Sequence, residues 1–235
     1  MVIFINFLII TLVLFAESSE INDDTVLYYY GLEESERGLP ACSERQACST
    51  LLERYWRPRA LLRLCRCAHR LRCDTPATTD RLIELNNRAF LQFCKPTTDW
   101  PECTINDTPL TVETSYDRMN PDEIENLHHE NQQLTPPKIV LSCRCRYPNY
   151  WKLKTEEETV STYQCSSLPL CKSGDYCGNV DNDSLALYQS CLCPKNHICV
   201  HNGGISFIQI SELLYRGKGW KAFCQAISDD YEYDY

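Results

Sequence analysis

The chain has 235 residues, a formal net charge of -9 at pH 7 and 16 cysteines. Its acidic balance argues against a general electrostatic affinity for nucleic acid or for anionic membrane surfaces. An even number of cysteines is typical of complete pairing, and disulfides persist only in oxidising compartments. We therefore expect eight disulfides in a secreted, extracellular protein.

Residues 1–40 contain no cysteine and divide into an apolar part and an acidic part. Residues 2–15 are nearly all apolar, and small and polar residues follow from Ala16 to Ser19. This pattern is typical of a signal peptide, here residues 1–18, and the run is shorter than the roughly 20 residues of a membrane span. An uncleaved anchor is the alternative. Residues 19–40 are expected to form an ordered arm, a flexible tail or a propeptide.

The cysteine spacing predicts three tandem repeats. Residues 41–95 follow the pattern C-x5-C-x16-C-x-C-x5-C-x20-C, and residues 170–225 follow C-x5-C-x13-C-x-C-x5-C-x24-C. Residues 102–166 hold four cysteines that fit the same frame, with Pro109 and Trp151 at its second and fifth positions. Internal repeats of this kind indicate that each unit is one structural module.

The two cysteines missing from the middle repeat predict which cysteines bond. An unpaired thiol is reactive in a secreted protein, so the loss of both members of one bond leaves no orphan. We therefore predict that the second and fifth cysteines pair, as Cys48–Cys73 and Cys177–Cys199. The other four pair one with three and four with six, or one with four and three with six, because a bond within C-x-C has poor geometry. Bonds between repeats are a further arrangement. The cysteines whose partners stay open are Cys42, Cys65, Cys67, Cys94, Cys103, Cys143, Cys145, Cys165, Cys171, Cys191, Cys193 and Cys224.

Each repeat is too small for a large apolar core, so disulfides must supply stability. We expect a small disulfide-rich, β-leaning mixed α+β fold of three tandem cysteine-frame repeats. Residues 138–142 and 204–210 are predicted strands because they are rich in β-branched residues. Apolar residues at helical spacing predict short helices within residues 80–93 and 211–223, which would close the first and third repeats.

Two polar segments are expected to lie outside the packed modules. Residues 104–142 of the middle repeat lack cysteine and are rich in acidic residues, which predicts a long exposed insertion. Residues 226–235 form an acidic, tyrosine-rich tail that is expected to be solvated. No second apolar run of membrane length occurs, so we expect no membrane span in the mature chain.

The sequence indicates a binding protein rather than an enzyme. It has no G-x-S-x-G, no H-E-x-x-H and no glycine-rich phosphate loop. Its close cysteine pairs are C-x-C rather than the C-x2-C of structural zinc sites. We expect no catalytic residue, no cofactor and no metal ion. Asn106 and Asn182 each begin an acceptor motif for N-linked glycans, which would mark exposed loops.

Three clusters place cations beside aromatic residues and are candidate target contacts. Such a pair can anchor a protein interface or plug the mouth of a channel, or its ring can simply pack while its cation is solvated. The Arg-rich segment 54–72 could also bind an acidic partner or a sulfated glycan. The candidate contacts are Trp56, Arg57, Lys152, Lys154, Lys218 and Trp220.

The repeated C-x5-C…C-x-C-x5-C frame, the 16 cysteines and the apolar N-terminus together resemble the larger cysteine-rich scoloptoxins of centipede venom, the eleventh scoloptoxin family. The resemblance covers residues 42–224. It implies a secreted venom toxin with eight disulfides that modulates ion channels of prey, such as voltage-gated channels. It carries over no channel-contact residue.

A second function class fits the same pattern, namely a secreted extracellular binding protein that antagonises a growth factor or a receptor. Secreted antagonists built from several disulfide-rich repeats, such as the insect giant-lens protein, have this general organisation. A protease inhibitor would need a rigid exposed reactive loop, which nothing in the sequence singles out. In each case we expect a monomer that contacts an extracellular protein target.

Overall fold

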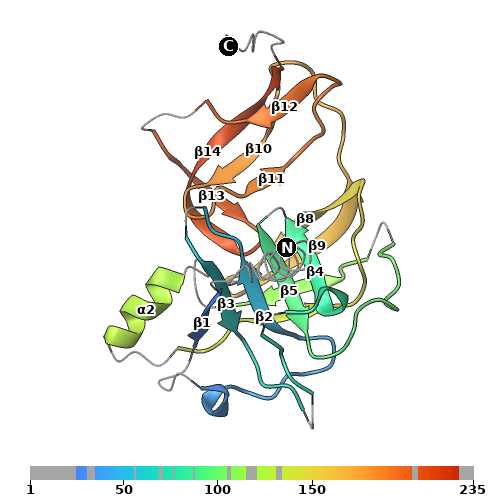
Figure 1. Cartoon of the computed structure of the whole chain (residues 1–235). Coiled ribbons are helices and arrows are strands. Elements are labelled where there is room, and N and C mark those ends of the chain that lie inside the picture. The colour runs from blue at the N-terminus through green and yellow to red at the C-terminus, as the bar shows by residue number, and fades with distance from the viewer. Residues whose placement is uncertain are drawn as a thin grey trace, which may run out of the picture.

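The computed structural model of the protein describes residues 25–30, 35–55, 57–68, 71–75, 77–86, 88–104, 107–114, 121–130, 134–202 and 206–227. Over these residues the chain forms three β-sheets and one α-helix (Figure 1). The predicted signal peptide, Trp56, Asn106 and residues 228–235 of the predicted tail lie outside these ranges. Within them, no helix has the length and apolar character needed to cross a membrane.

The first sheet runs in the order β1-β3-β2-β5-β4. Its strands are β1 (Thr25–Tyr29), β2 (Ala47–Leu52), β3 (Arg59–Arg63), β4 (Leu82–Asn86) and β5 (Ala89–Phe93). β1 pairs with β3 in parallel, and the other neighbours are antiparallel. Residues 25–29 of the predicted N-terminal arm are therefore an ordered edge strand. Two short 3-10 helices belong to this region, η1 (Glu36–Gly38) and η2 (Thr79–Arg81).

The middle and third sheets are antiparallel throughout. The middle sheet has the order β7-β6-β9-β8, with β6 (Leu110–Glu113), β7 (Lys138–Leu141), β8 (Asn149–Glu156) and β9 (Val160–Ser167). The third sheet has the order β11-β10-β14-β12, and β13 also pairs with β14. Its strands are β10 (Tyr176–Asp181), β11 (Leu187–Gln189), β12 (His197–Val200), β13 (Ile208–Glu212) and β14 (Tyr215–Ala226).

The three cysteine groups build sheets with one common strand order. In each sheet the first strand of the group is central, the second strand pairs on one side of it and the last strand pairs on the other. The shared orders are β3-β2-β5-β4, β7-β6-β9-β8 and β11-β10-β14-β12. The small, disulfide-rich, β-leaning fold is thus confirmed. That the three groups are tandem repeats of one module stays a prediction.

A short parallel bridge joins the entrance of each sheet to its C-x-C segment. In the first group the Cys42 amide donates to the Arg66 carbonyl oxygen at 2.9 Å, and the Arg66 amide donates to the Pro40 carbonyl oxygen at 2.8 Å. We call this arrangement the Pro-x-Cys bridge. The other two groups repeat both hydrogen bonds, between Cys103, Arg144 and Pro101 and between Cys171, Leu192 and Pro169. Each C-x-C segment therefore lies just after the second strand of its group, namely β3, β7 or β11.

The eight disulfides follow one pairing rule. Cys48–Cys73 and Cys177–Cys199 are present, and these are the two pairs that the sequence predicted. Of the arrangements that the sequence left open, the structure has one with three and four with six in every group, and no bond crosses between groups. These bonds are Cys42–Cys65, Cys67–Cys94, Cys103–Cys143, Cys145–Cys165, Cys171–Cys191 and Cys193–Cys224.

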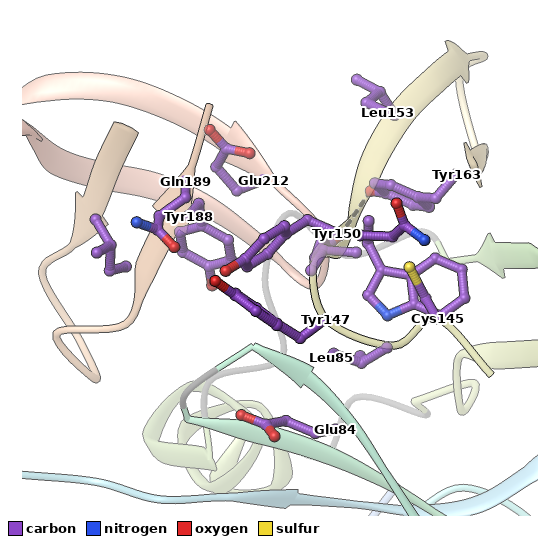
Figure 2. A pocket seen from close by; sticks show the side chains of 14 residues that line it. Glu84, Leu85, Cys145, Tyr147, Tyr150, Leu153, Tyr163, Tyr188, Gln189 and Glu212 are labelled. Carbon is purple, nitrogen blue, oxygen red and sulfur yellow. Dashed lines mark hydrogen bonds between the residues drawn. The ribbon is translucent and has the colours of Figure 1, made fainter. Parts of the chain in front are cut away.

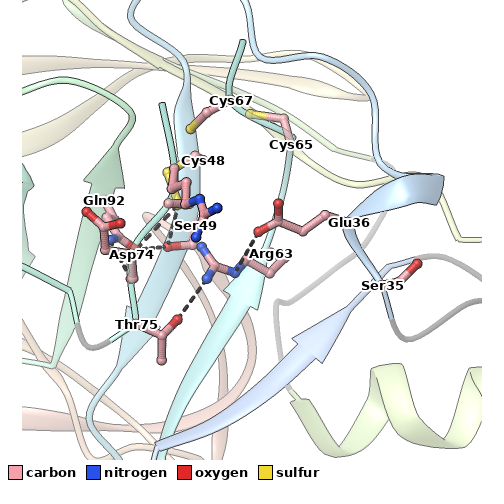
Figure 3. Close-up of polar contacts among 12 residues, drawn as sticks. Ser35, Glu36, Cys48, Ser49, Arg63, Cys65, Cys67, Asp74, Thr75 and Gln92 are labelled. Carbon is pink, nitrogen blue, oxygen red and sulfur yellow. Dashed lines mark hydrogen bonds and ion pairs between the residues drawn. A yellow bond between two sulfur atoms is a disulfide. The ribbon is translucent and has the colours of Figure 1, made fainter. Parts of the chain in front are cut away.

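A buried polar network lies beside the Cys48–Cys73 bond (Figure 3). The Ser49 hydroxyl donates to the Gln92 side-chain oxygen at 2.6 Å, and the Gln92 amide donates to the Asp74 carbonyl oxygen at 2.9 Å. The buried Arg63 guanidinium donates to the Thr75 hydroxyl at 2.8 Å. The buried side chains of Gln92 and Arg63 thus hold residues 74 and 75, which are not buried themselves, against the first sheet.

The first and middle sheets share one apolar core, whereas the third sheet has its own. Leu62 and Leu91 of the first sheet are buried in the same cluster as Leu110 and Ile139 of the middle sheet. The smaller core of the third sheet surrounds its disulfides and includes Val180. In Figure 1 the third sheet, in orange and red, accordingly lies apart from the other two.

The helix predicted within residues 80–93 is wrong, because this segment forms the β4–β5 hairpin. Ile83 and Leu85 are buried and Glu84 between them is exposed, which is the two-residue alternation of a strand. The helical spacing arose because apolar residues of two strands were read across the intervening turn.

The helix predicted within residues 211–223 is also wrong, because the segment holds the end of β13 and most of β14. Gly217 and Gly219 disfavour a helix by about 1 kcal/mol each. Gly219 is also needed for close packing, since a Cβ there would lie 2.5 Å from Cδ1 of Ile210.

The predicted exposed insertion over residues 104–142 is wrong in part. It contains β6 and α2 (Pro121–His129), and it runs into β7. Leu110 and Val112 of β6 and Ile124 of α2 are buried in the shared core, and α2 lies against β1. The strand predicted at residues 138–142 corresponds to β7, whereas the one predicted at 204–210 overlaps β13 only from Ile208.

Replacing Cys48 and Cys73 together by alanine should lower the free energy of unfolding by about 3 kcal/mol and leave the fold intact. The reason is that the middle sheet already folds with Pro109 and Trp151 at the equivalent positions. Denaturant unfolding of the purified oxidised variant measures the change.

The matched control removes Cys42 and Cys65, whose bond closes the Pro-x-Cys bridge of the same sheet. We expect this second variant to lose more stability or to fail to accumulate in the medium. A folded Cys42/Cys65 variant beside an unfolded Cys48/Cys73 variant would contradict the expectation.

Candidate binding clefts between the sheets

The turn between β13 and β14 holds the third sheet against the rest of the molecule. Leu213 and Leu214 in this turn pack against the core of the first and middle sheets. The Tyr163 hydroxyl of the middle sheet donates to the Leu213 carbonyl oxygen at 2.8 Å. Arg216 on β14 forms an ion pair with Glu156 on β8. Two clefts flank this junction.

The first cleft, which we call the anionic cleft, is lined by residues from all three sheets (Figure 2). Its volume is about 370 Å³, within the range of small-ligand sites. Aromatic and leucine side chains make up most of its walls, and two carboxylates lie among them. Those that matter most for its chemistry are Glu84, Tyr147, Tyr150, Trp151, Tyr188 and Glu212.

Burial shifts the titration of several groups in this cleft. Burial raises the pKa of Glu212, and the Asn179 amide, which donates to its carboxylate at 2.8 Å, partly offsets the shift. Burial also raises the pKa of Tyr163 to about 12. The pKa of Tyr150 is raised by burial first and then by Tyr147 and the Glu84 carboxylate. The cleft is therefore a partly desolvated site of negative charge.

The second cleft has the opposite charge, and we call it the arginine cleft. It lies between the first and third sheets, has a volume of about 250 Å³ and is lined by Arg54, Arg57 and Arg88. The guanidinium of Arg88 lies 4.8 Å from the centroid of the Tyr55 ring, in cation–π geometry. Tyr188 lines both clefts, so a cationic and an anionic recess share one wall.

The structure brings two of the predicted target contacts together, since Lys218 and Trp220 both lie against the Phe207 ring, but it does not gather the described contacts into one cleft. Arg57 is exposed in the arginine cleft, whereas Lys152 and Lys154 lie on β8 outside both clefts. Lys218 and Trp220 lie on β14, also outside the clefts. Lys218 stands 5.8 Å from the Phe207 ring centroid, and Trp220 stacks on His201 with centroids 4.9 Å apart.

The sequence did not single out the residues that define the anionic cleft. Tyr150 belongs to a basic–aromatic cluster from which only the cations were selected. Glu84 and Glu212 lie in the two segments that were predicted to be helices. The wrong secondary structure gave no indication that the two carboxylates line the same cleft. The one available signal is the run from Tyr147 to Tyr150, which places two aromatic residues directly after a C-x-C segment.

The cysteine sulfurs cluster tightly, but disulfides account for all of them. The sulfurs of Cys48, Cys67 and Cys73 lie within 4.8 Å of one another, because the Cys67–Cys94 disulfide lies beside the Cys48–Cys73 disulfide. Metal binding requires thiolates, and no cysteine of the described chain is free. In the described ranges, the residue groups that are close enough to hold a metal ion all consist of disulfide-bonded cysteines.

The candidate glycosylation site Asn182 is exposed in the turn after β10, at the rim of the arginine cleft. The buried Asp181 organises this turn. Its carboxylate accepts from the Ser184 amide at 2.5 Å and from the Ser184 hydroxyl at 2.8 Å. The acceptor asparagine is therefore presented on a defined surface turn.

The fold defines a class, that of small disulfide-rich β proteins suited to the extracellular space. No protein-family model matches the chain, and no curated protein matches it. Among solved structures it is similar to one described as the crystal structure of unliganded Argos, with a TM-score of 0.52 and 19% sequence identity. The alignment covers 86% of this chain and 99% of the Argos chain, so the likeness in fold extends over all of that protein.

Replacing Glu212 by glutamine should stabilise the protein at neutral pH, because burial disfavours the charged carboxylate there. A carboxyl whose folded pKa is raised favours folding while it is protonated. This contribution is present below its ordinary value of 4.5 and is lost as pH rises through the folded value. Thermal unfolding at pH 4 and pH 7 should therefore show a gain only at the higher pH. An equal gain at both would show that the carboxyl is not desolvated.

Asn182 should carry an N-linked glycan when the protein is secreted from eukaryotic cells. Treatment with peptide N-glycosidase should lower the mass of the parent protein. In the Asn182→Gln variant this decrease in mass should be smaller by the mass of one glycan. Asn106→Gln is the matched control for the other acceptor motif. An unchanged glycan mass in Asn182→Gln would contradict the assignment.

Proposed function

We propose that the protein is a secreted extracellular binding protein that captures a folded protein ligand, such as a growth factor or the outer domain of a receptor. The observation that carries the proposal is the likeness in fold to Argos over 99% of the Argos chain. The description of that structure as unliganded indicates that Argos binds a ligand. A shared arrangement of sheets makes the same kind of role the best-supported one for this chain.

The surface of the described residues suits a protein ligand. The eight disulfides hold three sheets rigidly, which lowers the entropy cost of forming an interface. The clefts at the sheet junction combine aromatic rings with charges of both signs, and tyrosine, tryptophan and arginine are the residue types that dominate binding energy at protein interfaces. The proposal involves no catalytic step.

The hypothesis of a channel-directed venom toxin rests on the cysteine frame that resembles scoloptoxins. The likeness to Argos gives it no support, and its described candidate contact residues do not line one common cleft. It therefore enters the test of function as the competing outcome.

A panel of purified growth factors and receptor outer domains tests the proposal against the natively oxidised protein immobilised for surface plasmon resonance. We expect saturable binding to one member at micromolar concentration or below, with association abolished after reduction and alkylation of the immobilised chain. The reduced chain has the same composition and controls for non-specific charge effects.

Voltage-clamp recording on insect neurons with the same preparation provides the competing outcome. A reversible change in current at nanomolar concentration, together with no binding in the panel, would overturn the proposal in favour of the toxin hypothesis.

A further inference from the structure

The anionic cleft has two carboxylates on opposite sides of a pair of tyrosine rings. Figure 2 shows Tyr147 and Tyr150 between Glu84 of the first sheet and Glu212 of the third. The two tyrosine rings meet edge to face, with centroids 6.3 Å apart and an interplanar angle of 79°. Ring faces and carboxylates are both regions of negative potential, so they act on an entering group with the same sign.

This negative potential is not compensated within the described chain. None of the fourteen lining residues is lysine, arginine or histidine. Other acidic residues near the sheet junctions have basic partners, as in the pairs Glu156–Arg216 and Glu102–Arg146. Glu212 instead accepts from the neutral amide of Asn179, and no ion pair within the described ranges involves Glu84. The Glu212 carboxylate is half-buried without a cation, which is unfavourable, whereas Glu84 is exposed and adds its charge at the edge of the cleft. A cation supplied from outside would relieve the burial of Glu212.

We propose that the anionic cleft receives a basic side chain, arginine or lysine, from the protein ligand. The inference rests on the proposed function and names the chemistry of one contact. A guanidinium or ammonium in the cleft would pair with the Glu212 carboxylate and contact the tyrosine rings, and the charge of Glu84 would add to the attraction. The cleft volume of about 370 Å³ accommodates a single long side chain.

The neighbouring arginine cleft helps to determine in which cleft a basic side chain would bind. It shares Tyr188 with the anionic cleft but carries Arg54, Arg57 and Arg88 against the single carboxylate of Asp183, so its formal charge is positive and disfavours a cation. A basic side chain that reaches the junction is therefore directed to the anionic side. The two clefts together would impose a fixed orientation on a ligand with charges of both signs.

The test uses N-acetyl-arginine amide as the probe and N-acetyl-citrulline amide as its neutral counterpart of nearly the same shape. Each is titrated into the full oxidised protein while tyrosine side-chain resonances are followed by NMR, with those of Tyr147 and Tyr150 assigned by single phenylalanine substitutions. With the arginine probe we expect saturable shifts of these two residues. The affinity for the citrulline probe should be lower than that for the arginine probe by about ten-fold or more.

Charge-removing variants separate the cleft from the overall acidity of the protein. Glu84→Gln combined with Glu212→Gln keeps the shape of both side chains and should weaken the arginine probe by about ten-fold or more. Glu157→Gln combined with Glu158→Gln removes the same charge from the exposed turn between β8 and β9, outside the cleft, and should leave the affinity unchanged.

Equal affinity for the two probes, equal effects of the two double variants, or no saturable shift at tens of millimolar would each overturn the inference. Because the titration needs no protein ligand, such a failure stays separate from the outcome of the growth-factor and receptor panel. The comparison of two probes on the unmodified protein remains decisive even where a variant does not fold.

Discussion

The Pro-x-Cys bridge is the constraint on which the rest of the structure depends. In each cysteine group two backbone hydrogen bonds and the disulfide between cysteines one and three hold the incoming chain against the C-x-C segment. The second cysteine of each C-x-C, which is cysteine four, forms a disulfide with cysteine six in or just after the last strand to pair with the central one. Two covalent bonds that start two residues apart therefore fix both the entry and the exit of every sheet, and small apolar cores suffice for the remainder.

The sequence predicted what depends on covalent pairing and failed on what depends on tertiary context. Counting cysteines led to the Cys48–Cys73 and Cys177–Cys199 bonds, because an orphan thiol is a local chemical problem. The segments 80–93 and 211–223 were assigned to helices because apolar spacing was read across turns that only the folded hairpins reveal. In the middle repeat, the short alternation of β6 was too weak to stand out from its acidic surroundings.

The candidate site was less predictable than the fold for a related reason. Its walls come from β4, β8, β11 and β13, so no stretch of sequence contains it. Local clusters of cations and aromatics drew attention to Lys152 and Lys218, which line neither cleft. The residues that meet there, such as Tyr150 and Glu212, are ordinary in their own segments. They acquire their character only when three sheets converge around them.

Trp151 stands where the other groups place their fifth cysteine, and it faces the last cysteine of its sheet in the same strand register as Cys199 faces Cys224. It is also part of the wall of the anionic cleft. In the middle sheet the position of Trp151 therefore takes part in no disulfide, and it borders the anionic cleft. Substitution there leaves no thiol without a partner, so the wall of the cleft can change at this position while the disulfides of the middle sheet stay intact.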